Sequence, residues 1–130
     1  MNKKVLVVDD DPDVRLINTS IVEENGYTPL EASDGEEGLK MVKKERPDLI
    51  LLDVLMPKQS GLRLYRELMT NKSFEKIPVV ILSGIAKKTF LRSQKALTEF
   101  GGASVPEPEI YLEKPVETED LADTIKKILG

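Results

Sequence analysis

The feature that most constrains the fold is a short apolar run that ends in a carboxylate. Leu49 to Leu52 are consecutive apolar residues, and Asp53 follows them directly. Pro47 and Met56-Pro57 bound the run, so it has the length of a strand. A strand that is apolar throughout is buried on both faces, as in parallel sheets, and open α/β sheets bind ligands at the carboxyl ends of their strands. Asp53 is therefore either a turn-forming residue or a functional carboxylate.

Strands and helices are predicted to alternate along the whole chain. The predicted strands are Val5 to Val8, Tyr27 to Ala32, Leu49 to Leu52, Pro78 to Leu82 and Glu109 to Leu112. Helices are predicted from Pro12 to near Asn25, between Ser33 and Arg46, after a loop from Met56 to Gly61, from about Lys87 to Phe100, and from Thr118 to Leu129. This order predicts one α/β domain, residues 1–130, with a parallel sheet, helices on both faces and right-handed crossovers.

Local signals predict how the first helix begins and which face it buries. Asp11 precedes Pro12 and is expected to cap this helix. Its buried face is expected to carry Val14, Ile17 and Ile21, which recur at helical spacing.

Further signals concern the second strand and two later helices. Pro29 cannot donate to a ladder, so the strand that contains it is expected at the edge of the sheet. Ser33, with Glu36 three residues later, predicts a capping box for the second helix. The fourth helix is expected to carry Phe90, Leu97 and Phe100 on one face.

Composition excludes several kinds of site. The sequence has no cysteine, so nothing points to disulfides or thiolate metal sites, and no histidine, which removes the usual general base and zinc ligand. The net charge of −4 argues against direct nucleic-acid binding. A small basic cluster is interpreted as a solvated helix face: Lys87, Lys88, Arg92 and Lys95. The first apolar run is too short for a signal peptide or a membrane span, so a cytoplasmic protein without membrane contact is expected.

Carboxylates follow two of the predicted strands. Asp9 and Asp10 follow the first strand and Asp53 follows the third. If these strands are neighbours, the three carboxylates meet in one pocket and repel one another unless a cation lies among them. Oxygen ligands that are open to water suit Mg²⁺ or Mn²⁺. The alternative is a solvated loop beside a helix cap.

Two further strand ends add a hydroxyl and a cation. Ser83 follows the fourth strand and Lys114 follows the fifth. Alone, each has an ordinary explanation as a turn residue or a solvated lysine. Together with the acids they supply a nucleophile, a metal site, a hydroxyl and a positive charge, which are the groups that hold a phosphoryl group.

Four segments of the sequence resemble the receiver domain of two-component response regulators. They are VLVVDDDPD, LILLDVLMP, VVILSG and YLEKPV, in the family's order and across essentially the whole chain. The resemblance implies a flavodoxin-like, doubly wound sheet of five parallel strands in the order 2-1-3-4-5, with about five helices. It also implies a phosphoacceptor domain rather than an enzyme in the usual sense.

The resemblance assigns roles to particular residues. Asp53 would accept the phosphoryl group, and Ser83 and Lys114 would contact its oxygens. Mg²⁺ would be bound directly by Asp10, Asp53 and the backbone carbonyl of Leu55, while Asp9 would act through a metal-bound water. Tyr111 matches the family's switch aromatic, and Lys114-Pro115 its usual cis peptide bond.

The family resemblance also implies partners. The phosphoryl group would come from a sensor histidine kinase, and the responding face would comprise Lys87 to Phe100, Glu109 to Leu112 and Thr118 to Leu129. That face would bind a downstream protein, a linked output domain or a second copy of the chain. No effector domain follows Gly130 in this sequence, so a stand-alone regulator and a receiver from a longer chain both remain open.

The sequence departs from the family pattern in two respects. The stretch between Ser83 and Lys114 is longer than usual, with the surplus around residues 100–109. Leu55 and Ile85 are apolar at positions where polar side chains often place the hydrolytic water, so a long-lived phosphorylated state is expected.

Three other functions fit the sequence less well. A haloacid dehalogenase-like phosphatase would use Asp9 and Asp11, but the acids beyond Lys114 that it also needs, Asp120 and Asp123, lie in a predicted helix. A receiver that only docks, without phosphorylation, is disfavoured by the complete set of site residues. A flavin-binding flavodoxin would need a phosphate-binding loop where this chain has acids.

Overall fold

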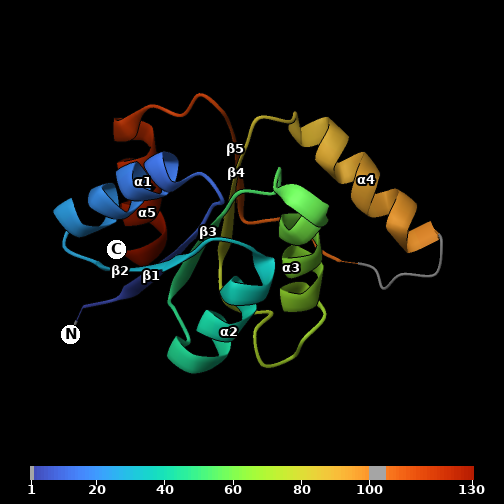
Figure 1. The fold of residues 1–130 in the computed structure, drawn as a ribbon, viewed down its shortest axis with the longest axis horizontal. Coiled ribbons are helices and arrows are strands. Elements are labelled where there is room, and N and C mark those ends of the chain that lie inside the picture. Colours follow the sequence, from blue (N-terminus) through green and yellow to red (C-terminus); the bar gives the residue numbers. More distant parts are fainter. Residues whose placement is uncertain (1, 100–104) are drawn as a thin grey trace.

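A parallel sheet between two layers of helices forms the framework (Figure 1). The computed structural model describes residues 2–99 and 105–130, and within them five parallel strands lie in the order β2-β1-β3-β4-β5. The strands are β1 (Lys4–Val8), β2 (Thr28–Ala32), β3 (Leu49–Leu52), β4 (Val79–Ser83) and β5 (Ile110–Glu113). The helices are α1 (Pro12–Glu24), α2 (Gly35–Glu45), α3 (Ser60–Met69), α4 (Lys87–Glu99) and α5 (Thr118–Leu129). The predicted fold class and strand order are confirmed, with β2 at one edge.

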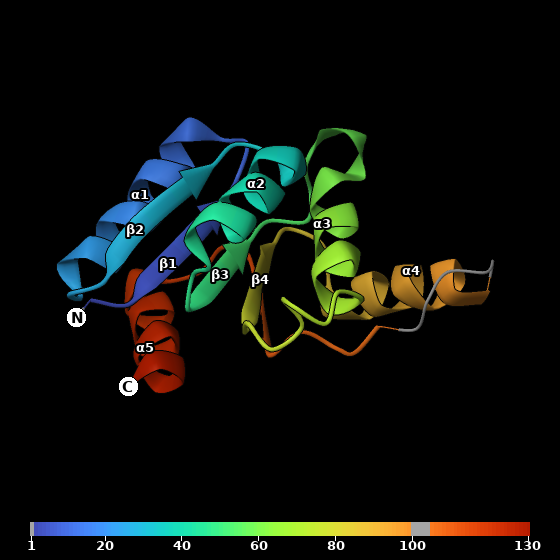
Figure 2. The ribbon, with the colours of Figure 1, turned by 90° about the horizontal axis from the view of Figure 1, so that it is seen from below.

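Each face of the sheet has its own hydrophobic core. Successive side chains of a strand point to opposite faces. Leu6 and Ile50 therefore belong to the core beneath α2, α3 and the start of α4, whereas Val7 and Leu51 belong to the core beneath α1 and α5. Figures 1 and 2 show α1 and α5 on one side of the sheet and the other helices on the opposite side. The central strands β1 and β3 are buried from both sides, as their apolar runs predicted.

Helix α1 begins as predicted. Asp11 is its N-cap, and the Asp11 Oδ1 atom accepts hydrogen bonds from the backbone N–H groups of Asp13 at 2.9 Å and Val14 at 3.4 Å. Pro12 occupies the first turn, where its missing N–H costs nothing. The acids Asp9 and Asp10 are thereby left out of the cap.

The predicted buried face of α1 was wrong at one position. Ile21 is buried, but Ile17 is 55% exposed and Leu16 is 64% exposed. The polar residues Asn18 and Thr19 are buried in their place. The Thr19 hydroxyl donates to the Leu16 carbonyl at 3.1 Å, so its burial leaves no unpaired group. An exposed apolar pair consequently remains on the outside of α1.

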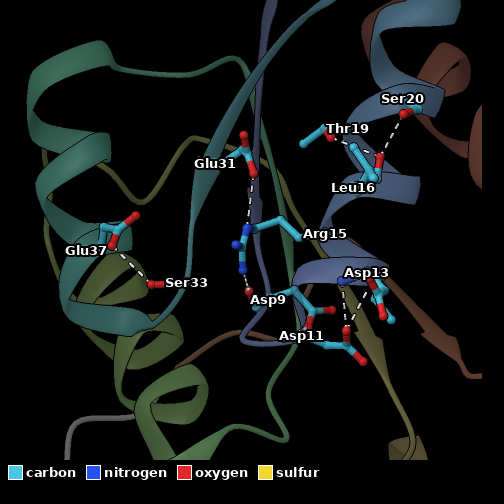
Figure 3. A network of polar contacts seen from close by, with 11 residues as sticks. Asp9, Asp11, Asp13, Arg15, Leu16, Thr19, Ser20, Glu31, Ser33 and Glu37 are labelled. Carbon is cyan, nitrogen blue, oxygen red and sulfur yellow. Dashed lines mark hydrogen bonds and ion pairs between the residues drawn. The ribbon is translucent and has the colours of Figure 1, made fainter.

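The predicted capping box of α2 was wrong by one residue. Asp34 is the N-cap and accepts a hydrogen bond from the Glu37 N–H at 2.8 Å. Ser33 instead donates through its hydroxyl to the Glu37 carboxylate at 3.1 Å (Figure 3). The helix starts at Gly35, where a Cβ would lie 2.3 Å from the Ser60 carbonyl oxygen, so the close approach of α2 to α3 requires a glycine.

The remaining boundaries differ little from prediction. The expected loop from Met56 to Gly61 is shorter, because Pro57–Gln59 forms a 3-10 helix and α3 begins at Ser60. Phe90 of α4 is fully buried, whereas the predicted positions of the Leu97 side chain and of Phe100 lie outside what the structure describes. No helix among the described residues is both long and apolar enough to cross a bilayer.

Candidate functional site

Three carboxylates meet at the carboxyl ends of β1 and β3, as predicted. One ligand oxygen from each of Asp9, Asp10 and Asp53 lies within 4.8 Å of the others. Asp9 and Asp53 are buried, with 2% and 6% of their surfaces exposed, while Asp10 is exposed. An all-oxygen set that is open to water on one side fits a hard divalent cation such as Mg²⁺.

Backbone hydrogen bonds continue the sheet up to these acids. The Asp9 N–H donates to the Ala32 carbonyl at 3.1 Å, and the Asp53 N–H donates to the Val8 carbonyl at 3.0 Å. Each acid therefore directly follows a central strand and extends its backbone pairing by one residue. Because both strands are buried, the two carboxylates have little freedom to move apart.

Neighbouring groups orient each carboxylate. Asp9 Oδ1 accepts from the Asp11 N–H at 2.9 Å, and Asp53 Oδ1 accepts from the Leu55 N–H at 2.9 Å. The guanidinium of Arg15 donates to the Asp9 backbone carbonyl at 2.8 Å and pairs with Glu31 at 3.0 Å (Figure 3). Arg15 was not identified from the sequence, because no motif connects it to the pocket. It links α1 and β2 to the end of β1.

Lys114 lies between the two buried acids. Its Nζ atom is 3.5 Å from Asp9 Oδ2 and 3.5 Å from Asp53 Oδ2. The Lys114 N–H donates to the Ser83 carbonyl at 2.8 Å, which extends the pairing of β4 with β5 beyond the end of β5. The peptide bond between Lys114 and Pro115 is cis, as the resemblance implied. Lys114 therefore lies beside the acids, as its position after the fifth strand predicted.

The Asp53 carboxyl has a perturbed pKa. Burial raises the pKa above its usual value of 3.8, and the negative charge of Asp9 raises it further. The Leu55 N–H and the positive charge of Lys114 act in the opposite direction. A single lysine therefore does not offset the burial and crowding of the acids, which is the situation in which a divalent cation binds favourably.

Ser83 and Tyr111 lie on the other side of β3 from the acids of β1. Ser83 is fully buried, and its Oγ accepts from the Ile85 N–H at 3.3 Å. The Tyr111 hydroxyl donates to the Ile85 carbonyl at 2.7 Å, and its ring centroid is 5.4 Å from that of Phe90. Tyr111 is half-buried in this structure. Tyr111, the predicted switch residue, thus contacts Ile85, two positions after Ser83. This contact could not be predicted from sequence spacing alone.

Gly61 supports the pocket in a way that the sequence did not reveal. A Cβ on Gly61 would lie 2.4 Å from the Asp53 carbonyl oxygen and 2.6 Å from Val54 Cα. The first turn of α3 therefore rests directly on the backbone of the candidate phosphoacceptor. The only sequence signal is the presence of a glycine, which on its own has many explanations.

Comparison with known proteins identifies relatives over nearly the full chain. Residues 5–126 match the family model described as response regulator receiver domain. The chain is 30% identical to Sporulation initiation phosphotransferase F of Bacillus subtilis (strain 168), with 99% of this chain and 95% of that protein aligned. It is 32% identical to Protein PilH of Pseudomonas aeruginosa, with 98% of each chain aligned.

A solved structure gives the same result. The chemotaxis response regulator CheY4 of Vibrio cholerae superposes with a TM-score of 0.80 at 26% identity, over 98% of this chain and 99% of that one. These comparisons give no support to the haloacid dehalogenase-like alternative. The described geometry also argues against it, because Asp11, which that reading needs in the reaction, is engaged in capping α1.

Proposed function

The chain belongs to the response regulator receiver domain family, and from that premise we propose that Asp53 is the residue that accepts the phosphoryl group. Receiver domains are signalling domains that are phosphorylated on an aspartate and that interact with histidine kinases and with output or other partner proteins. One observation carries the assignment. Strand β3 lies between β1 and β4, so Asp53 has Asp9 and Asp10 on one side and Ser83 on the other.

The transfer itself is a displacement at phosphorus. An oxygen of the Asp53 carboxylate attacks the phosphorus of a phosphohistidine, and the phosphorus–nitrogen bond breaks. The electron pair stays on the imidazole nitrogen, and the product is an acyl phosphate. Asp53 must be ionised to attack, and Lys114 favours the ionised form because its Nζ lies 3.5 Å from Asp53 Oδ2.

The remaining residues bind the transferred group. Lys114 and the Ser83 hydroxyl are placed to contact phosphoryl oxygens, because they end the strands beyond β3. Asp10, Asp53 and the Leu55 carbonyl would hold Mg²⁺ directly, and Asp9 would act through a water. When bound, the ion supplies positive charge that offsets the three carboxylates and the incoming phosphoryl dianion.

Labelling with a small phosphodonor tests the assignment. Wild type with acetyl phosphate and Mg²⁺ is expected to gain one phosphoryl group by intact mass, and Asp53→Asn is expected to gain none. Asp11→Asn is the matched control, because asparagine caps helices as well as aspartate does. Labelling of Asp53→Asn, or full labelling of the wild type in excess chelator, would refute the proposal.

The phosphorylated state is expected to be long-lived. Leu55 is 61% exposed beside the pocket, and Ile85 contributes an apolar side chain at the other rim. Neither can orient a water for attack on the acyl phosphate. A positioned polar group that takes part in proton transfer contributes on the order of 10²-fold, so Leu55→Asn should shorten the lifetime measurably. An unchanged or longer lifetime in that variant would contradict this account.

The phosphodonor protein is proposed to dock beside α1. A groove of about 480 Å³ runs between α1 and α5 from Lys114, and Ile17 lines it. The exposed apolar pair Leu16 and Ile17 lies on the same helix. A donor histidine can reach Asp53 only if its protein covers the rim of the pocket. Ile17→Ser should therefore slow transfer from a cognate kinase but not from acetyl phosphate, and equal slowing of both would exclude this site.

The signal is proposed to leave through α4, β5 and α5. The Tyr111 hydroxyl of β5 donates to the carbonyl of Ile85, which follows Gly84. Movement of Ser83 toward a phosphoryl oxygen would therefore disturb this hydrogen bond. Amide hydrogen exchange with and without beryllofluoride and Mg²⁺ tests this route. Changes are expected in α4 and β5, and changes confined to α1 and α2 would show a different route.

A further inference from the structure

Arg15 of α1 joins three elements at the end of β1 where the acids begin (Figure 3). Its Nη1 atom donates to the Asp9 backbone carbonyl at 2.8 Å, and its Nε atom donates to the Glu31 carboxylate at 3.0 Å. The Arg15 side chain is only 19% exposed, whereas Glu31, on the edge strand β2, is 59% exposed. One guanidinium therefore connects α1, β1 and β2 beside the acidic pocket.

Asp10 is the acid of the pocket whose own side chain is not held in place. Asp9 and Asp53 each accept a backbone N–H, and each lies 3.5 Å from Lys114 Nζ. The Asp10 carboxylate is exposed and forms no hydrogen bond or ion pair with any described residue. Its position therefore depends on the backbone that carries it.

The peptide unit between Asp9 and Asp10 is fixed from both sides of Asp9. The Asp9 N–H donates to the Ala32 carbonyl at 3.1 Å, and the Asp9 carbonyl accepts from Arg15 Nη1. A peptide unit is planar, so the direction of its carbonyl also sets where the Cα atom of the next residue lies. Arg15 thus determines the place from which the Asp10 carboxylate extends.

Glu31 limits the electrostatic effect of Arg15 on the pocket. A lone positive charge at this place would oppose a metal ion held by the acids. The Glu31 carboxylate, paired with Arg15 at 3.0 Å, offsets that charge. The planar guanidinium presents several N–H groups in a fixed geometry, so it can bind a carbonyl and a carboxylate together. The pair is suited to orienting the backbone without adding net charge.

We propose that Arg15, held by Glu31, is a positioning residue for the divalent cation. It orients the Asp9–Asp10 peptide unit so that the Asp10 carboxylate lies with those of Asp9 and Asp53, within the 4.8 Å that the three ligand oxygens span. Arg15 itself contacts neither the ion nor the phosphoryl group. This role rests on the proposed function, in which Asp10 binds Mg²⁺ directly. Groups that orient metal ligands typically contribute a factor of about 10 to 100 in metal affinity.

Titration of the full chain with Mn²⁺, followed by the electron paramagnetic resonance signal of the free ion, tests the proposal, and competition gives the affinity for Mg²⁺. Arg15→Met removes both hydrogen bonds but keeps an unbranched side chain, and it should weaken binding of either ion about tenfold. A purely electrostatic role predicts the opposite sign, because loss of a positive charge beside a cation site strengthens binding. Unchanged or tighter binding would overturn the proposal.

Lys4→Met is the matched control. Lys4 begins β1, and its Nζ pairs with Glu45 at 3.6 Å, so this variant also removes one positive charge and one ion pair of β1 or its neighbours. A strand rises about 3.3 Å per residue, which places Lys4 roughly 16 Å from Asp9, beyond the screening length of about 10 Å in ordinary salt. Its affinity for Mn²⁺ should change less than about twofold. Equal weakening in both variants would indicate a general loss of order and refute the positioning role.

Glu31→Ala tests whether the pair acts as a unit. Glu31 is exposed, so its replacement leaves the core intact, and it should weaken Mn²⁺ binding in the same direction as Arg15→Met. Adding Glu31→Ala to Arg15→Met should change the affinity less than about twofold further, because Glu31 acts through Arg15. Full additivity, or no effect of Glu31→Ala alone, would refute the role of Glu31.

Asp10→Asn separates the positioning role from the proposed function. Wild type that binds neither ion, or binds as well after Asp10→Asn, would refute the metal role of Asp10 and the proposed function with it. Binding that depends on Asp10 but not on Arg15 would refute the positioning role alone. Urea denaturation of every variant shows that the affinities compare folded proteins.

Discussion

The two ends of the candidate signalling path are packed differently. At the carboxyl ends of β1 and β3, Gly61 and Gly35 each lie so close to neighbouring backbone that a Cβ would fall within 2.4 Å of a carbonyl oxygen. The edge of the sheet beside α4 is less buried: every residue of β5 is at least partly exposed, whereas β3 and β4 are buried throughout. The strand that carries Asp53 is held from both faces, whereas the edge strand proposed to carry the signal is only partly covered.

This difference follows from what each region has to do. Phosphoryl transfer depends on holding an oxygen in line with phosphorus, and a displacement of about 1 Å can cost about 10²-fold in rate. A switch instead needs an element with two packings of similar free energy, which a close-packed core does not allow. Phe90 is the exception beneath α4, because it is fully buried between Tyr65 and Tyr111. It is the point at which the two regions meet.

The same substitution in the two regions should have very different costs. Leu64 of α3 is 3% exposed and approaches Gly38 closely, whereas Leu91 of α4 is only partly buried. Leu64→Ala should lower the free energy of unfolding by about 3 kcal/mol, and Leu91→Ala by about 1 kcal/mol. Urea denaturation measures both. Equal losses would show that the α4 side is packed as tightly as the α3 side.

Adding one methyl group should distinguish the regions more sharply in function than in stability. Gly61→Ala should cost about 2 kcal/mol and slow labelling of Asp53, because the new Cβ displaces the Asp53 backbone. Gly84→Ala is the matched control, since its Cβ would meet only Leu55 Cδ2 at 3.9 Å. Denaturation and the rate of labelling by acetyl phosphate are measured together. Normal labelling in a destabilised Gly61→Ala protein would remove the positioning role of Gly61.

The sequence sufficed to predict the framework and the acids of the site. Buried parallel strands are apolar at every position, so the run from Leu49 to Leu52 could be predicted as a central strand. Ligands bind at the carboxyl ends of such strands, and Asp53 is the residue at that end. Lys114 could be placed in the same way, because it follows the fifth strand. These predictions depend on local pattern and strand order alone.

Features that depend on packing between distant segments could not be predicted. Ser33 and Asp34 are both good capping residues, so sequence alone does not choose between them. The backbone angles decide that Asp34 is the N-cap. The exposure of Ile17 follows from how α1 is rotated on the sheet, and helical spacing leaves that rotation undetermined within about one residue. Gly61 contacts the backbone of Asp53, and Gln94 accepts a hydrogen bond from Arg66. Periodicity in the sequence does not reveal contacts between such distant segments.

Removing one hydroxyl tests how firmly residues 105–108 are held on the less buried side. The Tyr65 hydroxyl donates to the Pro106 carbonyl, and Tyr65 itself is fully buried. Tyr65→Phe should cost about 1 kcal/mol or less, because Pro106 is exposed and water can replace the donor. Amide exchange at 105, 107 and the residues that follow should become faster while exchange in β1 and β3 is unchanged.

Tyr27→Phe is the control for this variant. The Tyr27 side chain packs against the opposite core, and its hydroxyl makes no hydrogen bond to any described residue. A loss of stability in Tyr27→Phe as large as that in Tyr65→Phe, or faster exchange spread over the whole sheet, would show that the Tyr65 contact is not local.

The smallest expected effect is the pH dependence of stability that Asp53 contributes on the tight side. Burial and Asp9 raise its pKa in the folded state, while the Leu55 N–H and Lys114 partly oppose them, so the net change is limited. With the folded pKa above the unfolded value near 3.8, the folded state binds more protons between the two values. The contribution of Asp53 to stability is then fully present below pH 3.8 and is lost as the pH rises through the folded pKa.

Asp53→Asn keeps an acceptor for the Leu55 N–H but carries no charge. It should therefore be more stable than wild type at pH 7 without divalent cations, and the difference in unfolding free energy should shrink as the pH falls toward 4. Mg²⁺ should stabilise wild type more than the variant and reduce the difference at pH 7. Urea denaturation of both proteins across this range, with and without Mg²⁺, measures it. A difference that grows on acidification would mean that Lys114 and the Leu55 N–H outweigh burial, and that the pocket favours the charged carboxylate even without a metal.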